Sequence, residues 1–244
     1  MIQPRLRRAT QTFQRRVLRW YARYQRPLPW RRTRDPYKIL VSEIMLQQTQ
    51  VDRVIPKYHE FLKRYPTVQV LAKAPASEVR RVWYPLGYNI RPVRLRNIAK
   101  RVVERHAGHI PDSYDGLVAM DGIGRYTAGA VLSFAFKRDA PILDTNVARL
   151  LSRYFRIRKP LKHGATRRRL WELASAVIPK GQGYTINQAM MDFGALICTA
   201  RKPQCGICAL RRTCASYPLL RSSSYEGVSS KLQRNRAYVS DRRR

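Results

Sequence analysis

The four cysteines of the chain are the residues best suited to hold a cofactor, because all of them lie in one short stretch. Their spacing is Cys198-x6-Cys205-x2-Cys208-x5-Cys214. Two disulfides are one interpretation, but small disulfide scaffolds are usually far shorter than this chain of 244 residues. Structural zinc is a second interpretation. Zinc sites, however, usually contain two short pairs of ligands such as CxxC, and only one CxxC occurs here. Four thiolates at uneven short gaps favour a [4Fe–4S] cluster, whose corners are spread more widely than a zinc tetrahedron.

A glutamate in an apolar segment is a candidate general acid. Glu43 lies in "ILVSEIMLQQTQV", and on a helix its neighbours at i−4 and i+3 would be Ile39 and Leu46. Such surroundings disfavour the charged carboxylate and raise its pKa, which keeps the carboxyl protonated nearer neutral pH. A general acid needs that property. A glutamate that is partly exposed or paired is the alternative.

A glycine-containing turn in "AMDGIGRYTAGAV" is a candidate anion site. Gly122 and Gly124 let the backbone turn tightly and bring N–H groups to an anion at the start of a helix. Arg125 would add a cation beside the turn. An ordinary turn between two helices is the alternative, because a GxG pair is a weak signal by itself.

Hydrophobic periodicity predicts helices around these residues and an all-α fold. Apolar residues recur at steps of three, four or seven in "DPYKILVSEIMLQQTQVDRVIPKYHEFLKRY", and Phe13, Val17 and Tyr21 share one face of an N-terminal helix. Further helices are predicted in "RLRNIAKRVVERH", "DTNVARLLSRYF" and "RRRLWELASAVIP". Asp144 stands where a helix N-cap would be. No stretch alternates long enough to predict a sheet.

The charge of the chain indicates a polyanionic partner. The sequence holds 49 Lys plus Arg against 15 Asp plus Glu, a formal net charge of +34. Self-repulsion at that level costs stability, so nucleic acid is the leading candidate and an acidic membrane surface the second. A compositional bias towards arginine is the alternative. No apolar run approaches the length of a membrane span.

The cysteine spacing after "NQAMMDFGALIC" resembles the cluster loop of the endonuclease III superfamily of DNA glycosylases. The chain is most similar to the adenine-mismatch, or MutY-type, branch, over about residues 11–217. The resemblance implies a two-lobed helix-hairpin-helix fold with a [4Fe–4S] cluster on the four cysteines. A six-helix lobe with the hairpin would span 36–140, and the cluster lobe would combine 1–35 with 141–217. Residues 218–244 are rich in Ser and Arg, and we expect a disordered basic tail there.

The resemblance also implies roles for four residues at the reacting bond. Glu43 would protonate N7 of an extruded adenine, and an ionised Asp144 would stabilise the positively charged sugar, either electrostatically or by a covalent bond. Such a pair fits the general pattern of two carboxyls kept in different protonation states. Asn146 would support the site by hydrogen bonds. Where strand-nicking members carry an attacking lysine this chain has Tyr126, so no Schiff base is expected and the enzyme would be monofunctional.

Further residues match positions that the family uses to hold DNA. A target base must leave the stack, and side chains should fill the gap. Gln48 matches the wedge glutamine and Tyr88 the intercalating tyrosine. Gly122, Gly124 and Arg125 match the hairpin that grips the backbone without reading sequence. Trp30, Arg31, Leu46 and Gln188 match pocket positions, with core packing or a solvated arginine as alternatives.

The expected substrate is adenine opposite guanine or 8-oxoguanine in double-stranded DNA. A thymine/uracil glycosylase acting on T·G or U·G is the first alternative, because Asn89 stands where a second tyrosine is common and only the tail follows the cluster loop. A non-catalytic DNA-binding module with a metal site on the four cysteines is the second. We expect a cytoplasmic, nucleoid-associated monomer with no membrane partner.

Overall fold

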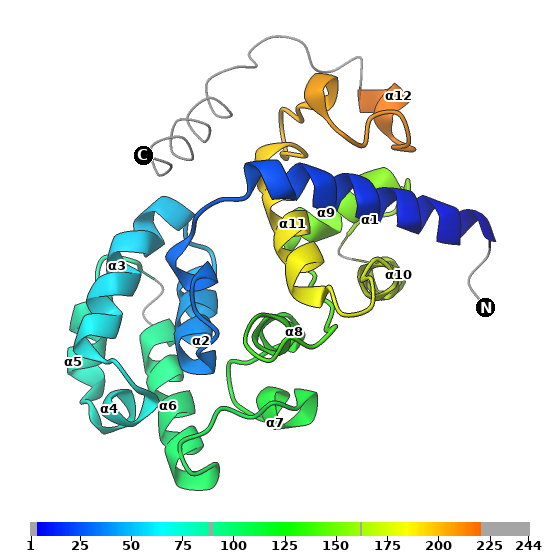
Figure 1. The fold of residues 1–244 in the computed structure, drawn as a ribbon. Helices are drawn as coiled ribbons and strands as arrows, with labels where there is room; N and C mark the ends of the chain where they lie inside the picture. Colours follow the sequence, from blue (N-terminus) through cyan, green and yellow to red (C-terminus); the bar gives the residue numbers. More distant parts are fainter. Residues whose placement is uncertain (1–3, 88–89, 162, 221–244) are drawn as a thin grey trace. The chain divides into compact units, whose positions relative to one another are not determined.

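The computed structural model describes residues 4–87, 90–161 and 163–220, and the regular elements in this part of the chain are helices joined by loops (Figure 1). It contains twelve α-helices and two short 3-10 helices, and no β-strand occurs among the described residues. The prediction of an all-α fold is therefore confirmed. Tyr88, Asn89 and residues 221–244 of the predicted tail lie outside the described residues. None of the described helices is both long enough and apolar enough to span a bilayer.

The chain forms two compact units. The central unit is Pro27–Ala140, and the terminal unit joins Met1–Arg26 to Pro141–Arg244. The sequence-based division assigns residues 27–35 to the cluster lobe, whereas the structure places them in the central unit. The described part of the central unit contains seven α-helices, where the prediction gave six.

The helix that carries Glu43 lies at the centre of the central unit. α2 (Pro36–Met45) packs against α3, α6 and α8. Its residues from Ile39 to Met45 are all buried, as expected for a helix surrounded by other helices. The carboxylate of Asp35 accepts a hydrogen bond from the Tyr37 N–H at 2.9 Å and so caps the first turn. The remaining elements of the unit are η1 (Pro29–Arg31), α3 (Val51–Arg64), α4 (Val68–Lys73), α5 (Ala76–Trp83), α6 (Ile90–Arg105), α7 (Tyr114–Val118) and α8 (Arg125–Phe134).

The glycine-containing turn joins α7 to α8, as the sequence indicates. Gly122 has φ +92°, which only glycine adopts readily, and Gly124 is the N-cap residue of α8. Ile123 is buried between the two glycines, and its N–H donates to the Met120 carbonyl at 3.0 Å. The apolar side chain therefore anchors the turn while both glycine backbones stay exposed.

The terminal unit is built around α11 (Gly183–Leu196), which packs against both α1 (Pro4–Tyr24) and α9 (Thr145–Tyr154). The Trp20 and Phe193 rings meet edge to face at 4.9 Å between centroids. Just after α1, the Arg26 Nε lies 2.6 Å from the Oδ1 of Asp192, a fully buried carboxylate. The other elements of the unit are α10 (Gly164–Ala176), η2 (Cys205–Ile207) and α12 (Tyr217–Leu220).

Candidate active site

Glu43 is buried, as the sequence predicts, and it is bonded to a second residue predicted for the site. The glutamate is 3% exposed in the middle of α2. Tyr126, in the first turn of α8, donates a hydrogen bond from its hydroxyl to Glu43 Oε2 at 2.9 Å. The packing of α2 against α8 brings together two side chains that are 83 residues apart in sequence. The carboxyl is thus held in one orientation inside an apolar unit.

Asp144 occupies the N-cap position of α9 in the terminal unit. Its Oδ1 accepts from the Val147 N–H at 2.7 Å, and its Oδ2 accepts from the Asn146 side-chain amide at 3.0 Å. Burial raises the pKa of Asp144 above its usual value, while these hydrogen bonds and the nearby Arg149 guanidinium lower it. Capping and a catalytic role are compatible, because the amide and the N–H fix the carboxyl orientation.

Arg149 connects Asn146 to the segment that begins the cysteine cluster. Its Nη2 donates to Asn146 Oδ1 at 2.8 Å and to the Gly194 carbonyl at 2.7 Å. Its Nε donates to the Cys198 carbonyl at 2.7 Å. Neither Arg149 nor Gly194 is among the site residues predicted from the sequence. The only signal was an isolated glycine within the apolar helix "AMMDFGALI", which often marks a close approach of backbone.

The predicted pocket and DNA-binding residues are divided between the two units. Trp30 is buried and meets the Tyr58 ring edge to face at 5.5 Å, which is the packing expected of a core aromatic. Arg31 and Leu46 are half-buried in the same unit, whereas Gln188 is buried on α11 of the terminal unit. The exposed residues are Gln48, Gly122, Gly124 and Arg125. Tyr88 lies outside the described residues.

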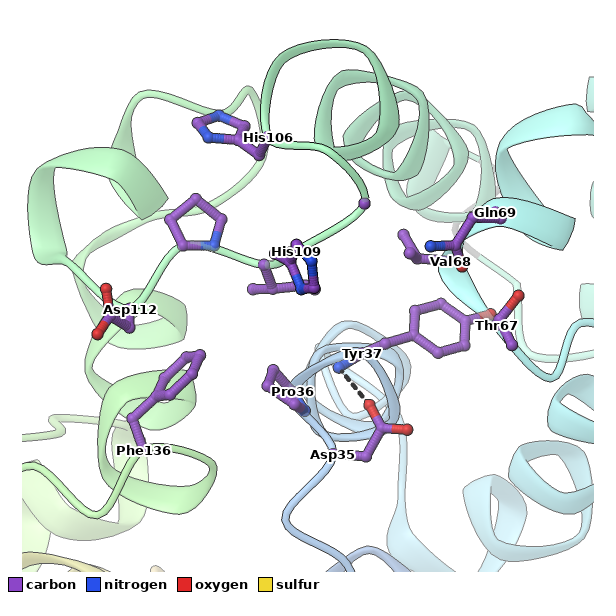
Figure 2. A pocket seen from close by; sticks show the side chains of 13 residues that line it. Asp35, Pro36, Tyr37, Thr67, Val68, Gln69, His106, His109, Asp112 and Phe136 are labelled. Atoms are coloured by element: carbon purple, nitrogen blue, oxygen red, sulfur yellow. Dashed lines mark hydrogen bonds between the residues drawn. The ribbon is translucent and has the colours of Figure 1, made fainter.

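A separate hollow of about 700 Å³ in the central unit contains none of the predicted site residues (Figure 2). Gln69, Val68 and Thr67 line one side of it, and Phe136 and Asp112 line the opposite side. Asp35 contributes its carboxylate to the wall, but that group already caps α2 through the Tyr37 N–H. The chemistry predicted from the sequence is therefore not gathered in this hollow.

The four cysteines line one small pocket in the terminal unit. Its remaining wall includes Phe193 and Leu210, both buried. All four cysteines carry free thiols, so the two-disulfide interpretation is wrong for this structure. Arg153 donates to Cys198 Sγ at 3.5 Å. Burial raises the pKa of the Cys208 thiol to about 12.

The cysteine spacing is consistent with either a zinc ion or a [4Fe–4S] cluster, and the arrangement of the thiols bears on that choice. Among the described residues, no three His, Cys, Asp or Glu side chains converge closely enough to hold one metal ion. Four thiols nonetheless share one pocket, which suits a group that takes one thiolate at each of several separate iron atoms. The residues present are therefore compatible with a group that takes four thiolates.

Comparison with known proteins gives the family. Residues 41–176 match the family described as "HhH-GPD superfamily base excision DNA repair protein", which is more than half of the chain. The matched segment includes Glu43, the glycine-containing turn and Asp144. The chain belongs to the HhH-GPD superfamily.

Relatives within the HhH-GPD superfamily carry two different names. The adenine DNA glycosylase of Buchnera aphidicola subsp. Baizongia pistaciae (strain Bp) is 41% identical over 209 residues, which are 85% of this chain and 59% of the relative. The thymine/uracil-DNA glycosylase of Pyrobaculum aerophilum is 34% identical over 206 residues, which are 82% of this chain and 90% of the relative. The chain thus spans about three fifths of the first protein and nearly all of the second.

A solved glycosylase structure has the same fold over nearly its whole length. The structure of a thermostable thymine-DNA glycosylase superposes with a TM-score of 0.81 at 33% sequence identity. The match covers 87% of this chain and 98% of that chain. The predicted helix-hairpin-helix glycosylase fold is thereby confirmed.

Proposed function

We propose that this HhH-GPD protein hydrolyses the N-glycosidic bond of a mispaired adenine, opposite guanine or 8-oxoguanine, in double-stranded DNA. The observation that carries the proposal is the buried Glu43 carboxyl held at 2.9 Å by the Tyr126 hydroxyl. A carboxyl in that position can deliver a proton to an extruded base. Because the neighbouring side chain is a phenol and not an amine, no Schiff base forms there and the strand is left intact.

The residues divide the reaction into bond cleavage and water addition. Glu43 gives its proton to N7 of the adenine, and the electron pair of the C1′–N9 bond leaves with the base. The ionised Asp144 stabilises the resulting positive charge on the sugar, in the orientation set by Asn146. A water molecule then adds at C1′ and gives a proton to the Glu43 carboxylate, which leaves an abasic site and restores the acid.

DNA binding in this proposal is electrostatic and largely independent of sequence. The exposed turn at Gly122 and Gly124 presents backbone N–H groups at the start of α8, with Arg125 beside them. Gln48, exposed after α2, would fill the gap left by the extruded base. Tyr88, which lies outside the described residues, keeps its predicted role as the intercalating tyrosine. A formal net charge of +34 supplies the long-range attraction to duplex DNA, which a monomer would bind.

We further propose that Cys198, Cys205, Cys208 and Cys214 hold a [4Fe–4S] cluster. When bound, the cluster crosslinks the loop and keeps its thiolates coordinated. The loop's exposed cations, Arg201, Lys202, Arg211 and Arg212, would then face phosphates. Iron and sulfide analysis of the purified protein tests this assignment. We expect about four irons per chain, because a [4Fe–4S] cluster contains four irons, each bound by one of the four thiolates. Stoichiometric zinc without iron would contradict it.

Thymine or uracil opposite guanine is the second candidate substrate. It is favoured by similarity to two glycosylases with thymine in their names, because the Pyrobaculum thymine/uracil-DNA glycosylase is 34% identical over 206 residues and a solved thymine-DNA glycosylase superposes with a TM-score of 0.81. The higher identity, 41% against 34%, favours adenine. The "LQQTQV" and "NQAMMDFG" segments favour adenine as well.

Single-turnover excision on four duplexes separates the candidates. The duplexes carry A·G, A·8-oxoguanine, T·G or U·G, and alkali reveals abasic sites. We expect adenine release from the first two and no strand cleavage before alkali. Release of thymine or uracil but not adenine would establish the second candidate. If the protein binds duplex DNA but releases a base from none of the four duplexes, the remaining interpretation is a non-catalytic DNA-binding module.

A further inference from the structure

An arginine that the sequence analysis passed over is buried at the end of the Glu43 helix. Arg91 is the second residue of α6, yet it is only 2% exposed. Its Nη1 donates to the carbonyls of Ile44 at 3.3 Å and Met45 at 2.9 Å, and also to the carbonyl of Gln47. Ile44 and Met45 end α2, where carbonyl groups have no further helical turn to bond with and where a cation is favourable.

The same guanidinium also holds a second segment. Its Nη2 donates to the carbonyls of Leu86 and Gly87, each at 3.0 Å, and to Thr49 Oγ1 at 3.1 Å. The Arg91 guanidinium carbon lies 5.4 Å from the centre of the Trp83 ring, within the range of a cation–π interaction. One side chain therefore ties residues 44–49 to residues 86–87, both within the central unit.

Gln48 lies between two of the residues that Arg91 holds. It has φ +54°, a left-handed conformation that is uncommon for a residue other than glycine. Its side chain is exposed, while Arg91 binds the Gln47 carbonyl before it and the Thr49 hydroxyl after it. Such a conformation persists only where the surroundings determine it. The hydrogen bonds of Arg91 constrain the backbone on both sides of this residue, together with the Thr49 N–H and hydroxyl, which donate to the Leu46 and Gln47 carbonyls at 3.4 Å each.

We propose that Arg91 is a positioning residue for base extrusion: it fixes the backbone that presents Gln48 to the DNA and holds it in register with residues 86–87. This inference rests on the proposed glycosylase function. Arg91 acts through Gln48 and does not touch the reacting atoms. The planar guanidinium, with its fork of N–H donors, can reach six oxygens from one position. A lysine ammonium has three donors and cannot.

The test is a double-mutant cycle between Arg91→Lys and Gln48→Ala. Single-turnover excision is measured on the duplex from which the parent releases a base fastest, and extrusion is followed by the fluorescence of 2-aminopurine beside the target base. We expect Arg91→Lys to slow both excision and base extrusion by about 10-fold, because the variant loses the net contribution of one or two hydrogen bonds. In the Gln48→Ala background the same substitution should change either rate by less than about 2-fold, because residues that act as a unit are not additive.

Two further variants separate positioning from general loss of stability. Val102→Ala, on a fully buried residue three turns along α6, is the control for lost core packing. If Val102→Ala lowers the melting temperature as much as Arg91→Lys does, it should still extrude bases at the rate of the parent. Thr49→Val removes one acceptor of the Arg91 fork and should slow extrusion by a smaller factor, which gives a milder variant if Arg91→Lys fails to fold. Amide hydrogen exchange of residues 46–50 should rise in Arg91→Lys and Thr49→Val, and not in Val102→Ala.

The outcomes distinguish this inference from the proposed function. If the parent excises no base, the proposed function fails and the role in extrusion fails with it. If the parent is active but the effects of Arg91→Lys and Gln48→Ala multiply, Arg91 does not act through Gln48. If Val102→Ala slows extrusion as much as Arg91→Lys at the same melting temperature, Arg91 contributes to the stability of the fold and not to the positioning of Gln48.

Discussion

Removing the Tyr126 hydroxyl is the most direct test of Glu43 as the general acid. Tyr126→Phe keeps the ring in place but deletes the donor to Glu43 Oε2. A hydrogen bond to a group that can be charged contributes about 1.5–3 kcal/mol, so we expect single-turnover excision to fall by roughly 10-fold or more. Tyr114→Phe, on an exposed tyrosine of α7, is the matched control. Equal rates in parent and Tyr126→Phe would remove the tyrosine from the mechanism.

Asp144 leads to a prediction about pH. Burial raises the pKa of its carboxyl, and an acid is ionised only above its pKa. If the ionised form is required, excision is lost as pH falls through the raised value, at a higher pH than for an ordinary aspartate near about 3.9. Asn146→Ala removes a hydrogen bond that lowers the pKa, so the acid limb of the pH–rate profile should move to still higher pH. Movement towards lower pH would contradict this assignment.

At the scale of elements, the crossing of α9 and α11 depends on a glycine. A Cβ on Gly194 would lie 2.8 Å from Asn146 Cβ and 2.9 Å from the Asn146 carbonyl oxygen. Gly194→Ala should therefore push the helices apart, lower the free energy of unfolding by about 1–3 kcal/mol and reduce excision, because Asn146 moves with α9. Urea unfolding and single-turnover excision measure the two effects.

Gly164→Ala is the control for this prediction. Gly164 begins α10, and a Cβ there would meet no atom within 4 Å. Alanine loses less backbone freedom on folding than glycine, so Gly164→Ala should be neutral or stabilising by up to about 1 kcal/mol. If both glycine variants behaved alike, close packing at Gly194 would not be the cause.

The helices that carry the site were predictable, and the bonds between them were not. Apolar spacing indicates that Glu43 is buried, and the position of Asp144 before "TNVARLL" indicates a cap. Arg149 and Arg91 bind mainly backbone carbonyls brought near by helix packing. Every residue has a carbonyl, so a sequence carries no mark of which ones are left without partners at a helix end.

The excess of basic residues makes a prediction at the scale of the whole molecule. Neutralising phosphates releases counterions, so the logarithm of the binding constant should fall linearly with the logarithm of salt concentration, by about 0.9 per phosphate contact. For roughly six contacts, duplex affinity should drop about 1,000-fold between about 50 and 200 mM salt. Fluorescence anisotropy with matched and mismatched duplexes measures this slope. We expect similar slopes for both, because the phosphate contacts do not read the mismatch. An affinity independent of salt would contradict electrostatic binding.

The two-part composition of the terminal unit has a consequence for biosynthesis. The helix Pro4–Tyr24 buries Phe13, Val17 and Trp20, yet its partner α11 begins only at Gly183. At a translation rate of about 5–20 residues per second, the ribosome needs on the order of 10 s to deliver that partner. The whole of Pro27–Ala140 emerges and can fold in the meantime. A nascent chain stalled before α11 would therefore display a basic helix whose Trp20 ring lacks its Phe193 partner, an exposed apolar surface of the kind that chaperones bind.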